Sequence, residues 1–415
     1  MRASFRLVNR AGTLCHRGVM RRHGHHWRCA AAAAVVSIAV SASVVCAQVP
    51  ALAPNEEPET LASAITPQAW THVEQSIERA LSWLARQQAD DGSFIAPANA
   101  QPAATSLAIM AYISKGHLPG EGPHGTQIDR AIDFVLRTQQ PDGLLAASGA
   151  GTRLGSDFQV SNGAASGKTA NYNHGIAGLM LTEVYGITDR ARASRLKPAI
   201  LKALEFSRTN QTERKLYPID SGGWRYLNYR TGGDSDLSVT SWQLMFYRSA
   251  RNAEFAVPKQ YVDEAIGYVL RCWDEPTGIF YYKKSGSDQR WSRGMVGAGI
   301  LSMAMAGQHE TRIAQRAGDW LLSRPFRQFG ESVGGGDRFF YSTYYCSQAM
   351  AQLGGRHWRQ FFPSLVNVLL TSQQGSGEWP SEPYGNDRMF GNTYTTALAV
   401  LSLTPPLQLL PVYQR

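Results

Sequence analysis

The chain has 415 residues and a formal net charge of +9 at pH 7. Residues 1–47 contain seven arginines, no lysine and no acidic residue, so the rest of the chain carries a net charge of only +2 (9 − 7 = 2). The basic character therefore belongs to the N-terminal segment, and it gives no support to nucleic-acid binding by the remainder.

The N-terminal segment has the composition of an export signal. A basic region is followed by the apolar run "CAAAAAVVSIAVSASVV" and then by "CAQ", which offers small side chains for cleavage after Ala47. We predict an export signal over residues 1–47, a Pro- and Glu-rich linker over residues 48–69, and a location in the periplasm, at the cell surface or outside the cell. The alternative is a retained N-terminal membrane anchor, because the run is about as long as the shortest spanning helices.

The cysteines indicate little disulfide or metal chemistry. Three of the five lie in the predicted export signal, which leaves Cys272 and Cys346. One pair is not a disulfide framework, so two separately buried thiols are expected. No Cys or His spacing typical of a zinc site occurs, and no metal site is predicted.

A two-helix unit recurs six times after the linker. The first helix of each unit has apolar residues three and four apart and a charged face, which is typical of a helix with one side in water. The second has little charge and many small residues, so it should be buried. First helices are expected near residues 73, 127, 196, 260, 312 and 359, and second helices near residues 104, 173, 237, 294, 341 and 392.

Six amphipathic helices around six buried ones predict an all-α fold, a closed α6/α6 toroid over residues 70–404 with a C-terminal tail at 405–415. An open superhelix is the alternative, but the last unit, with "TTALAVLSL", is too apolar for an exposed cap. Connections within units are much longer than the usual 4–6 residues or so. These loops and the N-terminal ends of the inner helices should share one rim, where we place the functional mouth.

The ends of several units carry a shared motif. Trp83, Gln87, Gly92 and Phe94 match Leu369, Gln373, Gly377 and Trp379. This pattern resembles the repeat of squalene and hopene cyclases and places residues 70–403 in the prenyltransferase and squalene-cyclase superfamily. The resemblance implies an α/α toroid, whereas function depends on sites that differ between members of a fold.

The stretch "GGDSDLSVTSW" contains the first candidate for catalysis. The resemblance implies that Asp234 and Asp236 match the Asp-x-Asp-Asp of hopene cyclases, whose middle acid protonates an alkene, but Leu237 replaces the last acid. Asp is also a preferred N-cap, and "DLSV" opens an apolar helix, so a capping role is the simpler interpretation. The same pair could hold a divalent ion such as Mg²⁺, although Asp-x-Asp is not specific for one; otherwise no cofactor is predicted.

Other candidates lie near the same rim. His174, at the start of an inner helix, is a third catalytic candidate, with a hydrogen-bonded structural histidine as the favoured alternative. Aromatic side chains on loops can stack on a ligand. The predicted ligand-binding residues are Trp224, Tyr226, Tyr229, Trp291, Arg293, Tyr341 and Tyr344.

Three functions remain open on these observations. We favour an exported toroid that lacks the full cyclase machinery and binds a small hydrophobic, carbohydrate or peptide ligand in its mouth, with peripheral membrane contact as a further partner. The second is an active isoprenoid cyclase or transferase that uses Asp234 and Asp236. The third is an exported glycosidase or lyase, which would need two carboxylates flanking one bond.

Overall fold

The structure is a computed structural model that describes residues 60–147, 167–227, 234–287, 289–382 and 387–414. The chain divides into two compact units, residues 1–56 and 57–415, and the described residues all belong to the second. The predicted export signal and most of the predicted linker therefore lie outside the described residues.

The described residues form twelve α-helices and one two-stranded antiparallel sheet, β1 (Trp273–Asp274) with β2 (Ile279–Phe280). The odd-numbered helices are α1 (Pro67–Arg86), α3 (Gly125–Arg137), α5 (Arg190–Thr212), α7 (Lys259–Arg271), α9 (Arg312–Leu322) and α11 (Gly355–Ser372). The even-numbered helices are α2 (Ala103–Ser114), α4 (Gly167–Tyr185), α6 (Leu237–Asn252), α8 (Arg293–Met305), α10 (Phe339–Leu353) and α12 (Gly391–Leu403). Short 3-10 turns are η1 (Leu61–Ala64), η2 (Ala98–Ala100), η3 (Pro218–Asp220), η4 (Asp387–Met389), η5 (Pro405–Leu407) and η6 (Pro411–Tyr413). The prediction of an all-α fold is confirmed.

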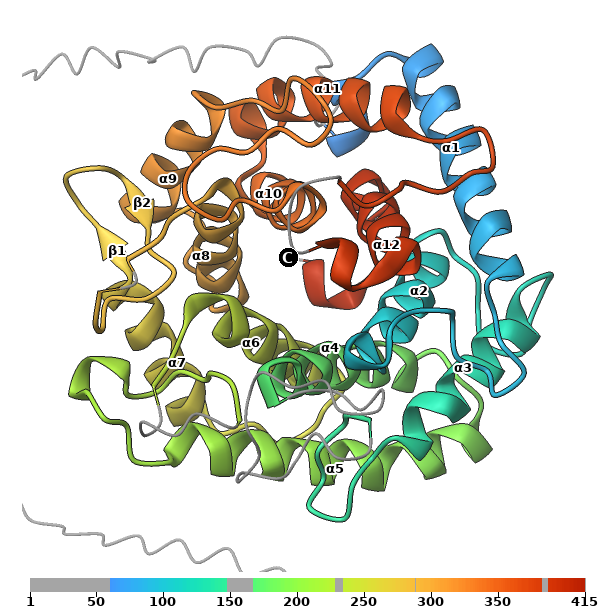
Figure 1. The fold of residues 1–415 in the computed structure, drawn as a ribbon, viewed down its shortest axis with the longest axis horizontal. Coiled ribbons are helices and arrows are strands. Elements are labelled where there is room, and N and C mark those ends of the chain that lie inside the picture. The colour runs from blue at the N-terminus through green and yellow to red at the C-terminus, as the bar shows by residue number, and fades with distance from the viewer. Residues whose placement is uncertain (1–59, 148–166, 228–233, 288, 383–386, 415) are drawn as a thin grey trace, which may run out of the picture. The chain divides into compact units, whose positions relative to one another are not determined.

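The two sets of helices differ in burial as the sequence predicts. Every residue of α2 and of α8 is buried, whereas α1 buries one stripe that includes Val73, Ile77 and Leu84. Figure 1 shows the even-numbered helices inside the odd-numbered ones. Each even-numbered helix packs against the next, and α12 packs against α2. The apolar core therefore lies between the two sets of helices and continues through the inner set.

A glutamine side chain at the end of several outer helices ties its loop to the next outer helix. The amide nitrogens of Gln88, Gln139, Gln211 and Gln373 each donate to the carbonyl of a loop glycine and to a carbonyl of another outer helix. For Gln373 these acceptors are Gly377 O at 2.8 Å and Ser76 O at 2.9 Å. The last loop is thereby tied to the first helix.

In the first copy of the repeat motif, the bridging glutamine is Gln88 and not Gln87. Gln87 was aligned with Gln373, but its backbone N–H bonds to Leu84 O and ends α1. Gln88 makes the bridging bonds, to Gly92 O and Gln127 O. The reason is spacing, because Gln88 precedes Gly92 by four residues, as Gln373 precedes Gly377.

Cys272 and Cys346 are both buried and free, which confirms the prediction of separate thiols. Among the described residues, no helix combines the length and the apolar character that crossing a membrane requires. The membrane-anchor alternative concerns residues outside this range and stays a prediction.

The loop glycines provide a test of the fold. Gly377 has φ +111°, and a Cβ there would lie 2.4 Å from Arg79 O, so Gly377→Ala combines backbone strain with a backbone clash. We expect it to lower the free energy of unfolding by about 1–3 kcal/mol. Gly375→Ala in the same loop is the control, because nothing lies within 4 Å of its added Cβ. Equal urea unfolding curves for the two variants would contradict the close approach of this loop to α1.

Candidate functional site

Asp236 is the N-cap of α6, as the simpler interpretation of "GGDSDLSVTSW" predicts. Its Oδ1 accepts hydrogen bonds from Val239 N–H at 2.8 Å and from the Ser238 hydroxyl at 2.7 Å. The side chain is completely buried. The acid therefore satisfies the first turn of an inner helix and lies at the positive end of the helix dipole.

The other oxygen of Asp236 contacts a buried arginine. Arg225 Nη1 lies 3.5 Å from Asp236 Oδ2, and Arg225 Nε lies 3.0 Å from Asp234 Oδ1. Lys283 Nζ lies 3.2 Å from Asp234 Oδ2, so two carboxylates face two cations. Because all four side chains are buried, solvent screens these pairs little.

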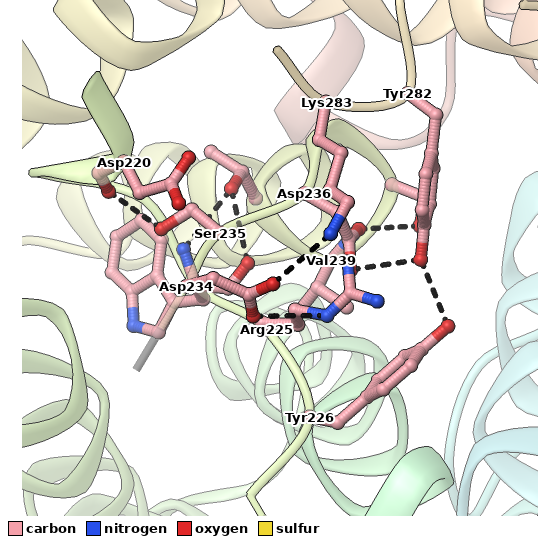
Figure 2. A network of polar contacts seen from close by, with 12 residues as sticks. Asp220, Arg225, Tyr226, Asp234, Ser235, Asp236, Val239, Tyr282 and Lys283 are labelled. Carbon is pink, nitrogen blue, oxygen red and sulfur yellow. Dashed lines mark hydrogen bonds and ion pairs between the residues drawn. The ribbon is translucent and has the colours of Figure 1, made fainter. Parts of the chain in front are cut away.

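Two tyrosines complete what we name the Arg225 cluster: Arg225, Tyr226, Asp234, Asp236, Tyr282 and Lys283. The Tyr282 hydroxyl donates to Asp236 Oδ2 at 3.1 Å and lies 2.8 Å from the Tyr226 hydroxyl. The guanidinium of Arg225 lies 4.6 Å from the centre of the Tyr226 ring. Figure 2 shows these side chains converging on Arg225 from three chain segments.

Backbone hydrogen bonds hold these segments in place. Asp236 N–H donates to Trp224 O at 3.0 Å, and Leu237 N–H donates to Tyr282 O at 2.8 Å. The loop before α6 and the loop after β2 are thereby fixed to the same helix end. The geometry of the cluster follows from main-chain contacts as well as from its charges.

The protonation balance of Asp236 reflects opposing causes. Burial raises its pKa above the ordinary value, whereas Arg225, Val239 N–H and the Ser238 hydroxyl lower it. Burial alone would lower the pKa of Arg225, but Asp236 raises it well above the usual value. Arg225 therefore stays charged, and its charge stabilises an ionised Asp236.

A second group of polar side chains, the Asp387 cluster, comes from the first turn of α10 and the residue before it, from α12 and from the loop after α11. Its members are Arg338, Tyr341, Glu382, Asp387 and Tyr394. Asp387 and Glu382 are buried. Both Arg338 and Asp236 act on the pKa of Tyr341, which burial raises.

His174 does not join either cluster. It is fully buried in α4, where Nδ1 accepts from Leu145 N–H at 3.1 Å and Nε2 lies 3.1 Å from Ala203 O and 3.0 Å from the Ser207 hydroxyl. Burial lowers its pKa to about 3. A neutral imidazole with both nitrogens occupied links α4 to α5, so the favoured structural interpretation describes it.

Two of the predicted loop aromatics, Trp224 and Trp291, pack within the protein. Trp224 is buried, and its indole N–H donates to Ser207 O at 2.8 Å. Trp291 packs edge-on against Trp320, with ring centres 5.7 Å apart, and Gly334 lies against it. Tyr226 is the loop aromatic that the structure brings to the Arg225 cluster, and Tyr229 lies outside the described residues.

Arg293, another predicted ligand-binding residue, is occupied within the protein. Its Nε lies 3.0 Å from Asp337 Oδ2 and its Nη1 lies 2.7 Å from Glu331 Oε1, and the side chain is fully buried. Its guanidinium also lies over the Phe326 ring at 3.9 Å. These contacts fasten the loop before α10 to the start of α8.

The two predicted tyrosines of α10 have different surroundings. Tyr344 stacks on Trp242 at 5.3 Å between ring centres, and its hydroxyl contacts that of Tyr413 in the C-terminal tail. Tyr341 is nearly buried, and its hydroxyl finds no hydrogen-bond partner among the described residues. Tyr341 therefore belongs to the candidate site, and Tyr344 to the packing beneath it.

Arg225, Lys283, Arg338 and Asp387 were missed by sequence reasoning. Arg225 had a usable signal, because it directly follows "GGW", the Gly-aromatic end of a repeat copy. Asp387 had no usable sequence signal, because the residues around it in the chain form no recognisable motif. Within the described ranges, no group of three or more His, Cys, Asp or Glu side chains is arranged to hold a metal ion.

The pairing of Asp236 with Arg225 can be measured as stability. Asp236→Ala removes a cap and leaves a buried guanidinium short of a counter-charge, so we expect a loss of about 3–5 kcal/mol. Asp189→Ala is the matched control. Asp189 caps α5 through Arg192 N–H at 2.9 Å but is exposed, so its loss should cost about 1 kcal/mol. Equal losses in guanidinium unfolding would contradict the buried pairing.

Solved structures share the fold of this chain. A variant of the type II terpene cyclase MstE from Scytonema, in complex with geranylgeranyl dihydroxybenzoate, matches with a TM-score of 0.52 at 14% identity. The match covers 83% of this chain and 100% of that one. A glycosidase variant in complex with glucose matches with a TM-score of 0.55 at 12% identity, over 83% of this chain and 100% of that one.

No family model and no curated protein matches the sequence. The structural matches bear on the fold alone at these identities, and they include both cyclases and glycosidases. At the level of the fold, they confirm the resemblance that the repeat motif showed to squalene and hopene cyclases. The chain therefore has the terpenoid cyclase-like α/α toroid fold, as a divergent example of it.

Proposed function

We propose that residues 57–415 form a closed toroid of six helix pairs that binds a carbohydrate-type ligand at the N-terminal ends of its inner helices. Closure is supported by the packing of α12 against α2 and by the hydrogen bonds that Gln373 exchanges with Ser76 of α1. The ligand class is supported by the side chains of the two clusters. We further propose that Asp234 and Asp236 do not perform cyclase chemistry.

The observation that carries this proposal is that both oxygens of Asp236 are occupied. Protonating an alkene requires a neutral acid with its proton directed at the substrate. Asp236 instead accepts from Val239 N–H, Ser238 and Tyr282, and it faces Arg225. These partners favour the carboxylate, against the burial that raises the pKa of Asp236. Asp234 is paired with Arg225 and Lys283.

The side chains around this position suit a ligand rich in hydroxyl groups. Tyr226 and Tyr282 combine an apolar ring face with a hydroxyl. Arg225 and Lys283 lie between acids, so the Arg225 cluster has balanced charge. A hydrocarbon chain packed against this cluster would cover charged and hydroxyl groups without offering them any hydrogen bond, which is unfavourable in a buried site.

The proposed setting is outside the cytoplasm. The basic and apolar composition of residues 1–47 supports export, and a retained anchor would hold the same toroid at a membrane surface. The comparison proteins also support a ligand site in this fold, since one was crystallised with glucose and another with a geranylgeranyl substrate. The ion pairs made by Asp234 and Asp236 favour a carbohydrate ligand over an isoprenoid one.

The test is a binding comparison with the full-length protein. We expect saturable binding of glucose in calorimetry, and neither binding nor conversion of geranylgeranyl dihydroxybenzoate. Tyr226→Ala should weaken glucose binding at least about tenfold, equivalent to about 1.4 kcal/mol. Tyr217→Ala is the control, because Tyr217 is exposed on a loop and contacts neither cluster.

Turnover of the geranylgeranyl compound without glucose binding would overturn the proposal and favour the cyclase hypothesis. Requirement for Mg²⁺ in that turnover, lost in Asp234→Asn, would identify Asp234 as a metal ligand instead. Equal glucose affinities for the two tyrosine variants would remove the Arg225 cluster from the site.

A further inference from the structure

Each carboxylate oxygen of Asp236 is the end of a short chain of hydroxyl groups. On one side, the Ser238 hydroxyl donates to Asp236 Oδ1 at 2.7 Å and is hydrogen-bonded to the hydroxyl of Tyr172 from α4. On the other side, the Tyr282 hydroxyl donates to Asp236 Oδ2 at 3.1 Å and lies 2.8 Å from the Tyr226 hydroxyl (Figure 2). One carboxylate therefore tethers two tyrosines, Tyr172 and Tyr226, through one intervening hydroxyl each.

The two tethered tyrosines are the accessible ends of these chains. Asp236, Ser238 and Tyr282 are buried, with exposed fractions of 0%, 3% and 8%. Tyr172 and Tyr226 are partly exposed. Their ring centres lie 6.2 Å apart, with 43° between the ring planes. Two accessible rings, one near the start of α4 and one on the loop before α6, are thus direct neighbours.

These rings are held in place in the absence of any ligand. The hydroxyl of each is tethered to Asp236, and the guanidinium of Arg225 also lies 4.6 Å from the centre of the Tyr226 ring. A partly exposed side chain ordinarily loses rotamer freedom when it binds a ligand, which weakens binding. Rings that are fixed beforehand avoid this loss, so their tethering favours a role in binding.

The tethers also decide which hydrogen bonds the two tyrosines can offer. A carboxylate only accepts, so the hydroxyls of Ser238 and Tyr282 direct their protons to Asp236. Each of them then accepts the proton of the tyrosine beyond it. The oxygens of Tyr172 and Tyr226 are left as acceptors. A ligand that reaches them must supply donors, as the hydroxyl groups of a sugar do and an isoprenoid chain does not.

We propose that Tyr172 and Tyr226 form a two-ring platform that stacks on one face of a sugar ring, with Asp236 as the positioning residue for both rings. The inference rests on the proposed carbohydrate site and adds to it Tyr172, which sequence reasoning did not single out. The C–H groups on a sugar face suit the negative face of an aromatic ring. Asp236 acts here through the tyrosines and transfers no proton.

The platform is tested by the dissociation constant of the full-length protein for glucose, measured by calorimetry. Tyr172→Ala removes one ring and should weaken binding at least about tenfold. Tyr185→Ala is the matched control, because Tyr185 is also a partly exposed tyrosine of α4 and its ring packs against Phe255 with centres 4.9 Å apart. It should bind glucose as wild type does.

The positioning role of Asp236 is tested by cutting one tether from both ends. Ser238→Ala breaks the tether to Tyr172 but keeps the hydrogen bond from Val239 N–H to Asp236. Tyr172→Phe breaks the same tether and keeps the ring. Each should weaken glucose binding about threefold, since one hydrogen bond is lost. The double variant should bind no more weakly than Tyr172→Phe alone, because both changes remove one interaction.

The second tether supplies an independent pair of variants. Tyr282→Phe and Tyr226→Phe should show the same lack of additivity. Ser241→Ala is the control on α6, because the Ser241 hydroxyl is bonded to that of Tyr345 at 2.7 Å and belongs to neither tether. It should leave glucose affinity unchanged, alone and combined with Tyr172→Phe.

The outcomes separate this inference from the proposed function. Glucose binding that Tyr172→Ala leaves intact overturns the platform, while the carbohydrate site stands. Losses that multiply in both double variants overturn the positioning role of Asp236. Absence of glucose binding by wild type overturns the proposed function and this inference together. If Tyr172→Ala does not fold, as judged by circular dichroism, the two pairs of conservative variants decide by the same criterion.

Discussion

The bridge from a glutamine amide to a loop glycine and to the next outer helix is the interaction on which the architecture depends. Each bridge satisfies two carbonyls with one side chain and brings the loop against a neighbouring helix. The glycine is required there because any Cβ would meet a backbone carbonyl, at 2.3 Å in the case of Gly222 and Glu264 O. The repeat motif therefore holds each loop against a neighbouring helix, which requires no chemistry.

The same bridges also position the candidate site. Arg225 comes three residues after Gly222, and Glu382 comes five residues after Gly377. In both loops a buried tryptophan, Trp224 or Trp379, follows the glycine and donates its indole N–H to a carbonyl of the preceding outer helix. The polar residues next along the chain are thereby delivered to the ends of α6 and α10. Scaffold and site are thus consecutive parts of one repeat unit.

The order of helices and the capping role of Asp236 could be predicted from sequence because both depend on local patterns. The sequence of α8 has small apolar residues throughout, which predicts burial on all sides. An Asp directly before an apolar run predicts an N-cap. The partners of charged residues could not be predicted in this way. Arg293 was predicted to bind a ligand, but it pairs with Glu331 and Asp337, and this pairing depends on the loop that follows α9.

The same limit explains the residues that sequence reasoning missed. Asp387 becomes distinctive only when α10 brings Arg338 and Tyr341 beside it, since neither lies near it in the chain. Trp224 looked like a ligand contact because it is aromatic and lies on a loop, but its indole N–H has an acceptor in α5. Residue type and loop position identify candidates, whereas the supply of hydrogen-bond partners decides between packing and function.

The two classes of comparison protein differ in what they require from an acid at this end of the toroid. A cyclase of the resembled kind needs a neutral acid with a free proton, whereas Arg225 and the Tyr282 hydroxyl favour the ionised form of Asp236 against the burial that raises its pKa. Removing Arg225 alone would leave Asp234 and Asp236 as buried neighbouring charges short of a cation, which costs several kcal/mol. A neutral acid at Asp236 would therefore require Arg225, Asp234 and the hydrogen bond from Tyr282 to change together. The buried ion pairs are therefore the basis on which a polar ligand is proposed at this position of the fold.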